Sequence, residues 1–195
     1  LPARAQAPMS PATRTEFEAS LVPRNAAALR LELWLGTLMV PAFWGLDWFV
    51  VPEHVWLTLV IRLLCTACGL AMLLSARLAP AWFARHVGPL AFGFSLMVAW
   101  SIALMCFLHA GYESPYYAGI NLLVMAVGLL FSWPTHMAIG FNLAIYAFYM
   151  APLALGLTPI TDLPTALSNQ LFLISTAIIT VASQIHRRTL ERREF

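Results

Sequence analysis

Arg62 lies in a long apolar stretch, where a charged side chain requires an explanation. No other charged residue occurs between Glu53 and Arg77. Burying an ionisable group in such a segment is costly, so its presence indicates a functional site or an internal ion pair. The small side chains of Cys65 and Gly69 share its helical face and predict that the arginine points into a helix bundle rather than at lipid.

Three acids are candidate partners for Arg62, namely Asp47, Glu53 and Glu113. A carbonyl or hydroxyl of a bound ligand is the other candidate. An ion pair would lock two helices together, whereas a ligand contact would make Arg62 a recognition residue, and the two roles can coexist. We expect Arg62, with Asp47 and the neighbouring Trp44, to contribute to ligand binding.

The segment from Tyr112 to Leu122 places an acid, three phenols and an amide at the mouth of one predicted helix. Ser-Pro at positions 114 and 115 predicts the start of that helix. Asn121 would lie one to two turns inside, where an amide needs a hydrogen-bond partner. We expect Glu113, Tyr117 and Asn121 to bind ligand, and we interpret Tyr112 as part of an interfacial aromatic belt.

A mostly polar seam runs along the last apolar segment, and its members are spaced alternately four and three residues apart. This period of 3.5 keeps one stripe of side chains facing a single neighbouring helix. The stripe packs either within the bundle or against a second copy of the chain, and we favour a homodimer interface. Its members are Asn169, Leu173, Thr176, Thr180 and Ser183.

Four histidines form two conceivable pairs, His54 with His109 and His86 with His136. A b-type haem needs two axial ligands that face each other at one depth. All four lie at the predicted edges of apolar segments, where histidines are usually interfacial side chains. We therefore expect no cofactor and no metal, with haem b as the alternative.

The three cysteines, Cys65, Cys68 and Cys106, have no fourth ligand nearby and are expected to be reduced packing residues. The sequence contains no P-loop, no G-x-S-x-G and no H-E-x-x-H pattern. Nothing in these motifs points to catalysis within the chain.

The amino-acid composition indicates whether the segments that carry these residues lie in water or in lipid. Of 195 residues, 61% are hydrophobic and 10% are charged, against about 25% charged residues in a soluble domain. This composition excludes a water-soluble enzyme domain and indicates a chain embedded in a lipid bilayer. A formal net charge of +2 is too small to indicate binding to nucleic acid.

Six segments are long and apolar enough to cross a bilayer as helices, which requires roughly 20 residues each. Pro41 predicts a kink in the first segment. The 48 residues 114–161 carry no charge and would extend about 72 Å as one helix, so Pro134 predicts a break between two helices. The expected fold is an all-α bundle of six transmembrane helices, near residues 31–51, 55–75, 87–110, 116–133, 135–157 and 163–185.

Most of the arginines lie on one side of the predicted helix bundle. Ten of the eleven flank the segments on the side of the two termini, while the other three connections contain acids and no arginine. The positive-inside rule therefore predicts cytoplasmic termini in a bacterial inner membrane. We expect a cytoplasmic arm with a possible interfacial helix at 1–29, a transmembrane sensor domain at 30–185, and the start of a cytoplasmic coiled coil at 186–195.

These residues resemble a known architecture. Val40-Pro41-Ala42-Phe43-Trp44 and Ile61-Arg62-Leu63-Leu64-Cys65 resemble the six-helix membrane region of bacterial sensor histidine kinases that detect α-hydroxyketone autoinducers. The Ser114–Leu122 run is similar to a segment in the six-helix anchors of class III adenylyl cyclases and sensor kinases. The resemblance implies a quorum-sensing or related receptor domain that perceives a small lipophilic ligand, within a two-component kinase or a cyclase.

The leading hypothesis is therefore a dimeric membrane receptor domain, itself not an enzyme, that transmits through its last helix to a C-terminal kinase or nucleotide cyclase. Three alternatives remain open. The first is a haem-binding redox sensor, and the second is a small transporter, which would normally show paired broken helices. The third is an anchor that only dimerises an enzyme.

Overall fold

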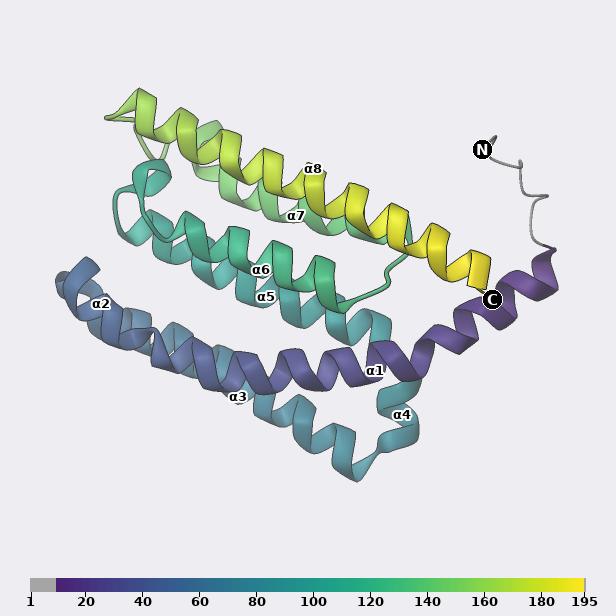
Figure 1. Ribbon diagram of the computed structural model, residues 1–195. Helices are drawn as coiled ribbons and strands as arrows, with labels where there is room; N and C mark the ends of the chain where they lie inside the picture. The colour runs from purple at the N-terminus through teal and green to yellow at the C-terminus, as the bar shows by residue number, and fades with distance from the viewer. Residues whose placement is uncertain (1–9, 195) are drawn as a thin grey trace.

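The computed structural model describes residues 10–194, which form a bundle of roughly parallel and antiparallel helices with no strand (Figure 1). The first nine residues of the predicted cytoplasmic arm lie outside the described part of the chain. In chain order the elements are α1 (Pro11–Ala42), α2 (Trp44–Val50), η1 (Pro52–His54), α3 (Val55–Leu78), α4 (Pro80–Arg85), α5 (Val87–Leu108), η2 (Gly111–Glu113), α6 (Tyr117–Leu130), α7 (Thr135–Ala154) and α8 (Leu163–Glu194).

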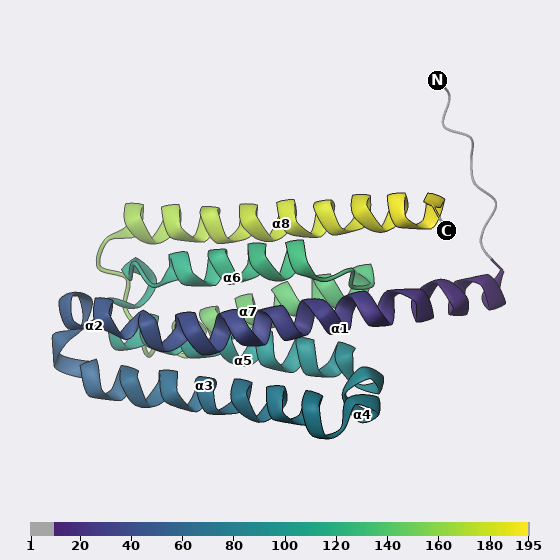
Figure 2. The same ribbon diagram turned by 60° about the horizontal axis from the view of Figure 1, so that its bottom comes forward.

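The long elements run up and down the bundle in alternating directions (Figures 1 and 2). The first turns of α1, the short helix α4 and the last turns of α8 gather at one end, which we call the terminal end. The opposite end holds α2 and η2 and is called the distal end. Six passes return the chain to the end where the described part begins, and α6 and α8 consequently run in the same direction.

Five helical stretches are long and apolar enough to cross a membrane, within Thr15–Val50, Pro52–Leu78, Val87–Leu108, Thr135–Ala154 and Leu163–Glu194. The fourth predicted span is shorter than expected, because α6 has only 14 residues, or about 21 Å. A bilayer core is about 30 Å thick. The protein is thus a helical membrane protein, while the count of six spans and the cytoplasmic side of the terminal end stay predictions.

The helix α1 begins at Pro11 and continues past Pro23 to Ala42. The interfacial helix that is predicted within 1–29 therefore corresponds to the first half of α1. The predicted kink at Pro41 corresponds to a one-residue interruption at Phe43, after which α2 begins. A proline within a helix lacks the N–H of the ladder and crowds the preceding turn, which accounts for the interruption.

The predicted break at Pro134 is confirmed. The helix α6 ends at Leu130, Phe131 has extended backbone (φ −100°, ψ 145°), and α7 begins at Thr135 directly after Pro134. A residue before proline avoids the helical conformation, so Trp133 cannot prolong α6. The short connection folds back onto the bundle instead of leading out into solvent.

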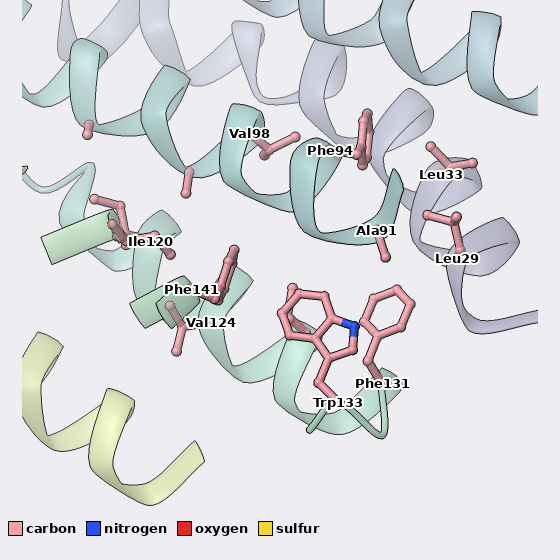
Figure 3. Packing of buried hydrophobic residues seen from close by; sticks show 14 of the residues in the cluster. Leu29, Leu33, Ala91, Phe94, Val98, Ile120, Val124, Phe131, Trp133 and Phe141 are labelled. Carbon is pink, nitrogen blue, oxygen red and sulfur yellow. The ribbon is translucent and has the colours of Figure 1, made fainter. Parts of the chain in front are cut away.

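The core of the bundle lies around α5, which contacts α1, α3, α6 and α7. Its alanines Ala91, Ala99 and Ala103 are fully buried, and such small side chains let neighbouring helices approach closely. Near the terminal end, Trp133 of the α6–α7 connection stacks on Phe131, with ring centroids 5.2 Å apart, and meets Phe141 of α7 edge-on (Figure 3). The same connection that ends α6 thus caps the core.

Candidate functional site

Arg62 lies two turns into α3 and forms a two-pronged ion pair with Asp47 of α2. Its Nε donates to Oδ2 of Asp47 and its Nη2 to Oδ1, both at 2.8 Å, while Nη1 donates to the backbone oxygen of Val40 at 3.0 Å. The two side chains are 6% and 0% exposed. Of the three acids that the sequence offers as partners, Asp47 is the one in contact.

Tyr116, directly before α6, extends this ion pair to a fourth element. Its hydroxyl donates to Oδ1 of Asp47 at 2.6 Å. Every nitrogen of the Arg62 guanidinium has an acceptor, and the carboxylate accepts from two residues, so the buried charges are well paired. We call Arg62, Asp47, Tyr116 and the Val40 carbonyl the distal knot, because they hold α1, α2, α3 and α6 together.

Trp44 supports the distal knot from the side. Its indole N–H donates to the backbone oxygen of Val55 at 3.0 Å, which fixes the start of α3 against α2. Its ring lies 5.7 Å from that of Trp48 and 5.9 Å from that of Trp56, centroid to centroid. Trp48 and Trp56 are largely exposed at the distal end, as expected for side chains at a membrane interface.

Glu113 does not join the distal knot. Its carboxylate accepts from the backbone N–H and the hydroxyl of Thr161, each at 2.6 Å, and from the backbone N–H of Asp162 at 2.5 Å. The N–H of Asp162 and the hydroxyl of Thr161 lower the pKa of this carboxyl below its ordinary value. Glu113 therefore ties η2 to the connection between α7 and α8.

Tyr112 is a core residue, so its interpretation as part of an interfacial belt is wrong. It is 2% exposed, and its hydroxyl accepts from the backbone N–H of Leu153 at 2.7 Å. Its backbone oxygen accepts from Asn169 of α8 at 2.9 Å. The turn that contains η2 folds Tyr112 inward, which the pattern of the sequence does not reveal.

Tyr117 and Asn121 lie one turn apart on α6 and are half-buried. Neither contacts Arg62, so the predicted ligand residues fall into three separate groups: the distal knot, the Glu113 loop and this face of α6. Asn121 is predicted to need a hydrogen-bond partner, yet its Oδ1 has none among residues 10–194.

The polar seam of α8 packs largely within the chain, which is the alternative that the sequence leaves open beside a homodimer. Asn169, Leu173 and Thr180 are buried, and Thr180 lies against Gly128 of α6. A Cβ added at Gly128 would come within 2.0 Å of the Thr180 methyl, so only glycine permits this approach. Ser183 is exposed. A homodimer through α8 stays a prediction.

Two ion pairs at the terminal end join α8 to the first turns of α1. Arg188 of α8 pairs with Glu18 of α1, and Glu191 of α8 pairs with Arg24 of α1. The connection between α6 and α7 takes part as well, because Ser132 donates from its hydroxyl to Glu191 at 2.8 Å and accepts from Arg188 at its backbone oxygen at 3.2 Å.

Phe17 of α1 completes this contact. Its ring is 1% exposed and lies 5.7 Å from the guanidinium carbon of Arg188 and 5.8 Å from that of Arg192. A guanidinium over an aromatic face is a favourable cation–π arrangement. We call the contact of Phe17, Glu18 and Arg24 with the last turns of α8 the terminal latch.

Arg187 fixes the same turns of α8 to α6. Its guanidinium donates to the backbone oxygens of Gly128 and Leu129, both at 2.5 Å, and of Phe131 at 2.6 Å. These are carbonyls at the end of α6 that lack partners within the helix. The arginines at 187–193 enter the topology prediction alone, although opposite charges near Glu18 and at 187–193 on one predicted side indicate such a contact.

Glu32 of α1 is another residue that sequence reasoning missed. It is 6% exposed, and its Oε1 accepts from the Ser95 hydroxyl of α5 at 2.5 Å. Its Oε2 has no partner within the described residues. An acid inside the first apolar helical stretch is the signal that could have identified it.

The histidine pairs each lie at one end of the bundle, His54 with His109 distally and His86 with His136 at the terminal end. Nδ1 of His86 lies 2.8 Å from the backbone oxygen of Trp82. Within residues 10–194 no group of three or more His, Cys, Asp or Glu side chains could hold a metal ion. Haem binding stays a prediction.

A sequence model of MASE8, a family of membrane-associated sensor domains, matches residues 45–195. The match includes Asp47, Arg62 and Tyr116 of the distal knot and all of α8, whereas Val40 and the α1 half of the terminal latch lie before it. The comparison with curated proteins found no match, and the comparison with solved structures found none.

Proposed function

The chain belongs to the MASE8 family of membrane-associated sensor domains, and on that premise we propose that it senses a small lipophilic ligand and transmits the signal through α8. The output is a kinase or a nucleotide cyclase joined after α8, on the cytoplasmic side of a bacterial inner membrane. The chain itself supplies the receptor function and no catalysis.

The observation that carries this proposal is the continuity of α8. It runs as one helix of 32 residues from the distal end, through the bundle, to a charged stretch with four arginines. A helix without a break moves as a rigid element, so a shift or rotation within the bundle reaches its last turn. An anchor without a signalling role would not need this continuity.

The terminal latch supports a defined resting position for α8. Arg24 is 50% exposed and Glu18 is 39% exposed, so both ion pairs are partly solvated and can exchange with water at small cost. The distal knot, in contrast, keeps α1, α2, α3 and the start of α6 fixed. We therefore assign Arg62, Asp47 and Trp44 to positioning the helices, and we place ligand recognition on α6, with Tyr117 and Asn121.

The test exploits the rigidity of α8. The chain is fused after Glu194 to the catalytic domain of a class III adenylyl cyclase, with insertions of zero to seven alanines at the junction. Each inserted residue rotates the output domain by about 100°. We expect cyclase activity to oscillate and to recover at seven insertions, as a heptad contact between two output domains requires.

The control replaces the membrane domain by an unrelated dimerising transmembrane helix with the same insertions. A purely dimerising anchor predicts equal activity at every insertion and no effect of the latch variant Glu18→Gln. That result would reject a signalling role for α8. A change of output with Glu18→Gln, at unchanged expression, supports it.

A further inference from the structure

A groove of about 470 Å³ lies between α6, α7 and α8. Its walls are apolar residues of all three helices, and α7 adds two polar side chains, Asn142 and Tyr146. Leu143 and Ile178 on its lining are more than 60% exposed, so the groove opens to the lipid-facing surface. The volume falls within the range of small-molecule sites, roughly 300–1,000 Å³.

The groove is elongated along α8. It is lined from Leu173 to Ile185, a length of about 18 Å along the helix axis. No charged residue lines it. An apolar trough of this length, open to lipid along its side, fits a single hydrocarbon chain.

Three polar side chains with buried polar atoms lie one turn beyond the groove, each on a different one of its helices; Tyr149 is fully buried, and Asn121 and Gln170 are half-buried. Asn121 precedes the lining residue Val124 by three positions on α6, and Gln170 precedes Leu173 by three on α8. On α7, which runs the opposite way, Tyr149 follows Tyr146 by three. All three positions are therefore displaced toward the distal end.

Four polar atoms of these side chains have no hydrogen-bond partner among residues 10–194. The unpaired atoms are Oδ1 of Asn121, both Oε1 and Nε2 of Gln170, and the hydroxyl of Tyr149, whose side chain is fully buried. A buried polar atom without a hydrogen bond is costly, and a site with several of them requires an explanation. Together they offer donors and acceptors, and none of the three carries a charge at neutral pH.

We infer that the groove binds the hydrocarbon tail of an uncharged single-chain amphiphile, whose hydroxyl or carbonyl head bonds to Asn121, Gln170 and Tyr149. The inference rests on the proposed function and identifies its ligand class and site. A charged head is disfavoured, because no counter-charge lines the groove. The ligand site is thus on α6, α7 and α8, away from Arg62.

The first experiment uses the unmodified protein in phospholipid nanodiscs and a dodecan-1-ol that carries a photoreactive diazirine in its tail. Labelled positions are mapped by mass spectrometry. Competition by dodecan-1-ol, dodecane and dodecanoate is compared at equal mole fraction in the bilayer. We expect labelling on the groove faces of α7 and α8, and at least tenfold stronger competition by dodecan-1-ol than by either of the other two.

Two variants test the tail and the head separately. Ala177→Trp fills the groove and is expected to reduce labelling at least tenfold, while the matched control Ala67→Trp, on an exposed face of α3, leaves it unchanged. The double variant Asn121→Leu/Gln170→Leu is expected to retain labelling but to lose the preference for dodecan-1-ol over dodecane.

Several results would overturn the inference. They are labelling outside the groove, equal competition by dodecane in the unmodified protein, or cross-links that show a second copy of the chain in the groove. Binding is measured here without any output enzyme. If dodecan-1-ol does not bind but the cyclase output depends on the number of inserted residues, only the groove site is rejected. If dodecan-1-ol binds but the cyclase output does not change with insertions, only the signalling role is rejected.

Discussion

The two ends of the bundle join their helices with the same pairing of arginine and carboxylate in two different environments. At the distal end Arg62 and Asp47 are 6% and 0% exposed and every guanidinium nitrogen has an acceptor. At the terminal end one partner of each pair is substantially exposed. Burial makes the distal pair costly to break, whereas water can replace a partner in the terminal pairs.

This difference suits the proposed signalling role, in which the distal frame stays assembled while α8 moves. A frame that must stay assembled benefits from a pair whose separation leaves an unpaired charge in a low-dielectric interior. A helix that must move benefits from contacts whose loss costs little free energy.

The largest effect is expected at the distal knot. Arg62→Met leaves Asp47 buried without its counter-charge, and we expect a loss of about 3–5 kcal/mol in the free energy of unfolding. Thermal unfolding in detergent measures it, with Arg77→Met, at an exposed position of α3, as the matched control. The double variant Arg62→Met/Asp47→Leu should recover most of the loss. Equal instability of the double variant would contradict an electrostatic origin.

A smaller effect is expected where α6 and α8 touch. Gly128→Ala drives a methyl into Thr180, and we expect a loss of about 1–3 kcal/mol. Gly140→Ala has open space and should be neutral or stabilising by up to about 1 kcal/mol. Adding Thr180→Ser to Gly128→Ala removes the clashing methyl and should restore stability in urea unfolding. No restoration would mean that the helices are spaced by something other than this contact.

The terminal latch is expected to contribute less. Glu18→Gln should cost about 1 kcal/mol or less, because Glu18 is partly solvated. The contribution of the terminal latch can nevertheless be detected from the mobility of a spin label at position 194. This mobility should rise in Glu18→Gln and at high salt. Glu16→Gln, on the same exposed stretch of α1, should leave mobility unchanged. A latch as rigid as the distal knot would show no salt dependence.

The smallest effect is expected at Glu113, which is only partly exposed. Its pKa is lowered from the ordinary 4.5, mainly by the N–H of Asp162 and the hydroxyl of Thr161. A lowered folded-state pKa means that its contribution to stability is complete above pH 4.5 and is lost as the pH falls through the lowered value. Hydrogen exchange at Thr161 and Asp162, compared with global exchange at each pH, should therefore increase below pH 4.5. In Glu113→Gln this pH dependence should be absent.

Much of the helix layout could be predicted from the sequence. The predicted starts at Val55, Val87, Thr135 and Leu163 coincide with those of α3, α5, α7 and α8. These boundaries depend on local properties, namely prolines, charges and apolar length. The predicted end of α6, near residue 133, was wrong. The helix stops at Leu130, because the residues that follow fold inward and cap the core.

The candidate site was less predictable. Asp47, 15 positions before Arg62, was one of the three acids predicted as its partner. The choice among the three acids depended on how the helices are rotated. Glu113 found backbone donors 48 and 49 positions away. Gln170 and Tyr149 carry no sequence signal, because an amide or a phenol becomes exceptional only when its neighbours leave it unpaired.

From the amino-acid sequence alone, this protein is recognisable as a bundle of lipid-embedded helices with ten of its eleven arginines on one side. The reason is that apolar length, proline and charge act on each segment independently of the others. Three further features follow from tertiary packing: Arg62 pairs with Asp47, the α8 seam faces α6, and a groove ends near four polar atoms without hydrogen-bond partners. These outcomes depend on the rotation and register of several helices at once, which no single segment specifies.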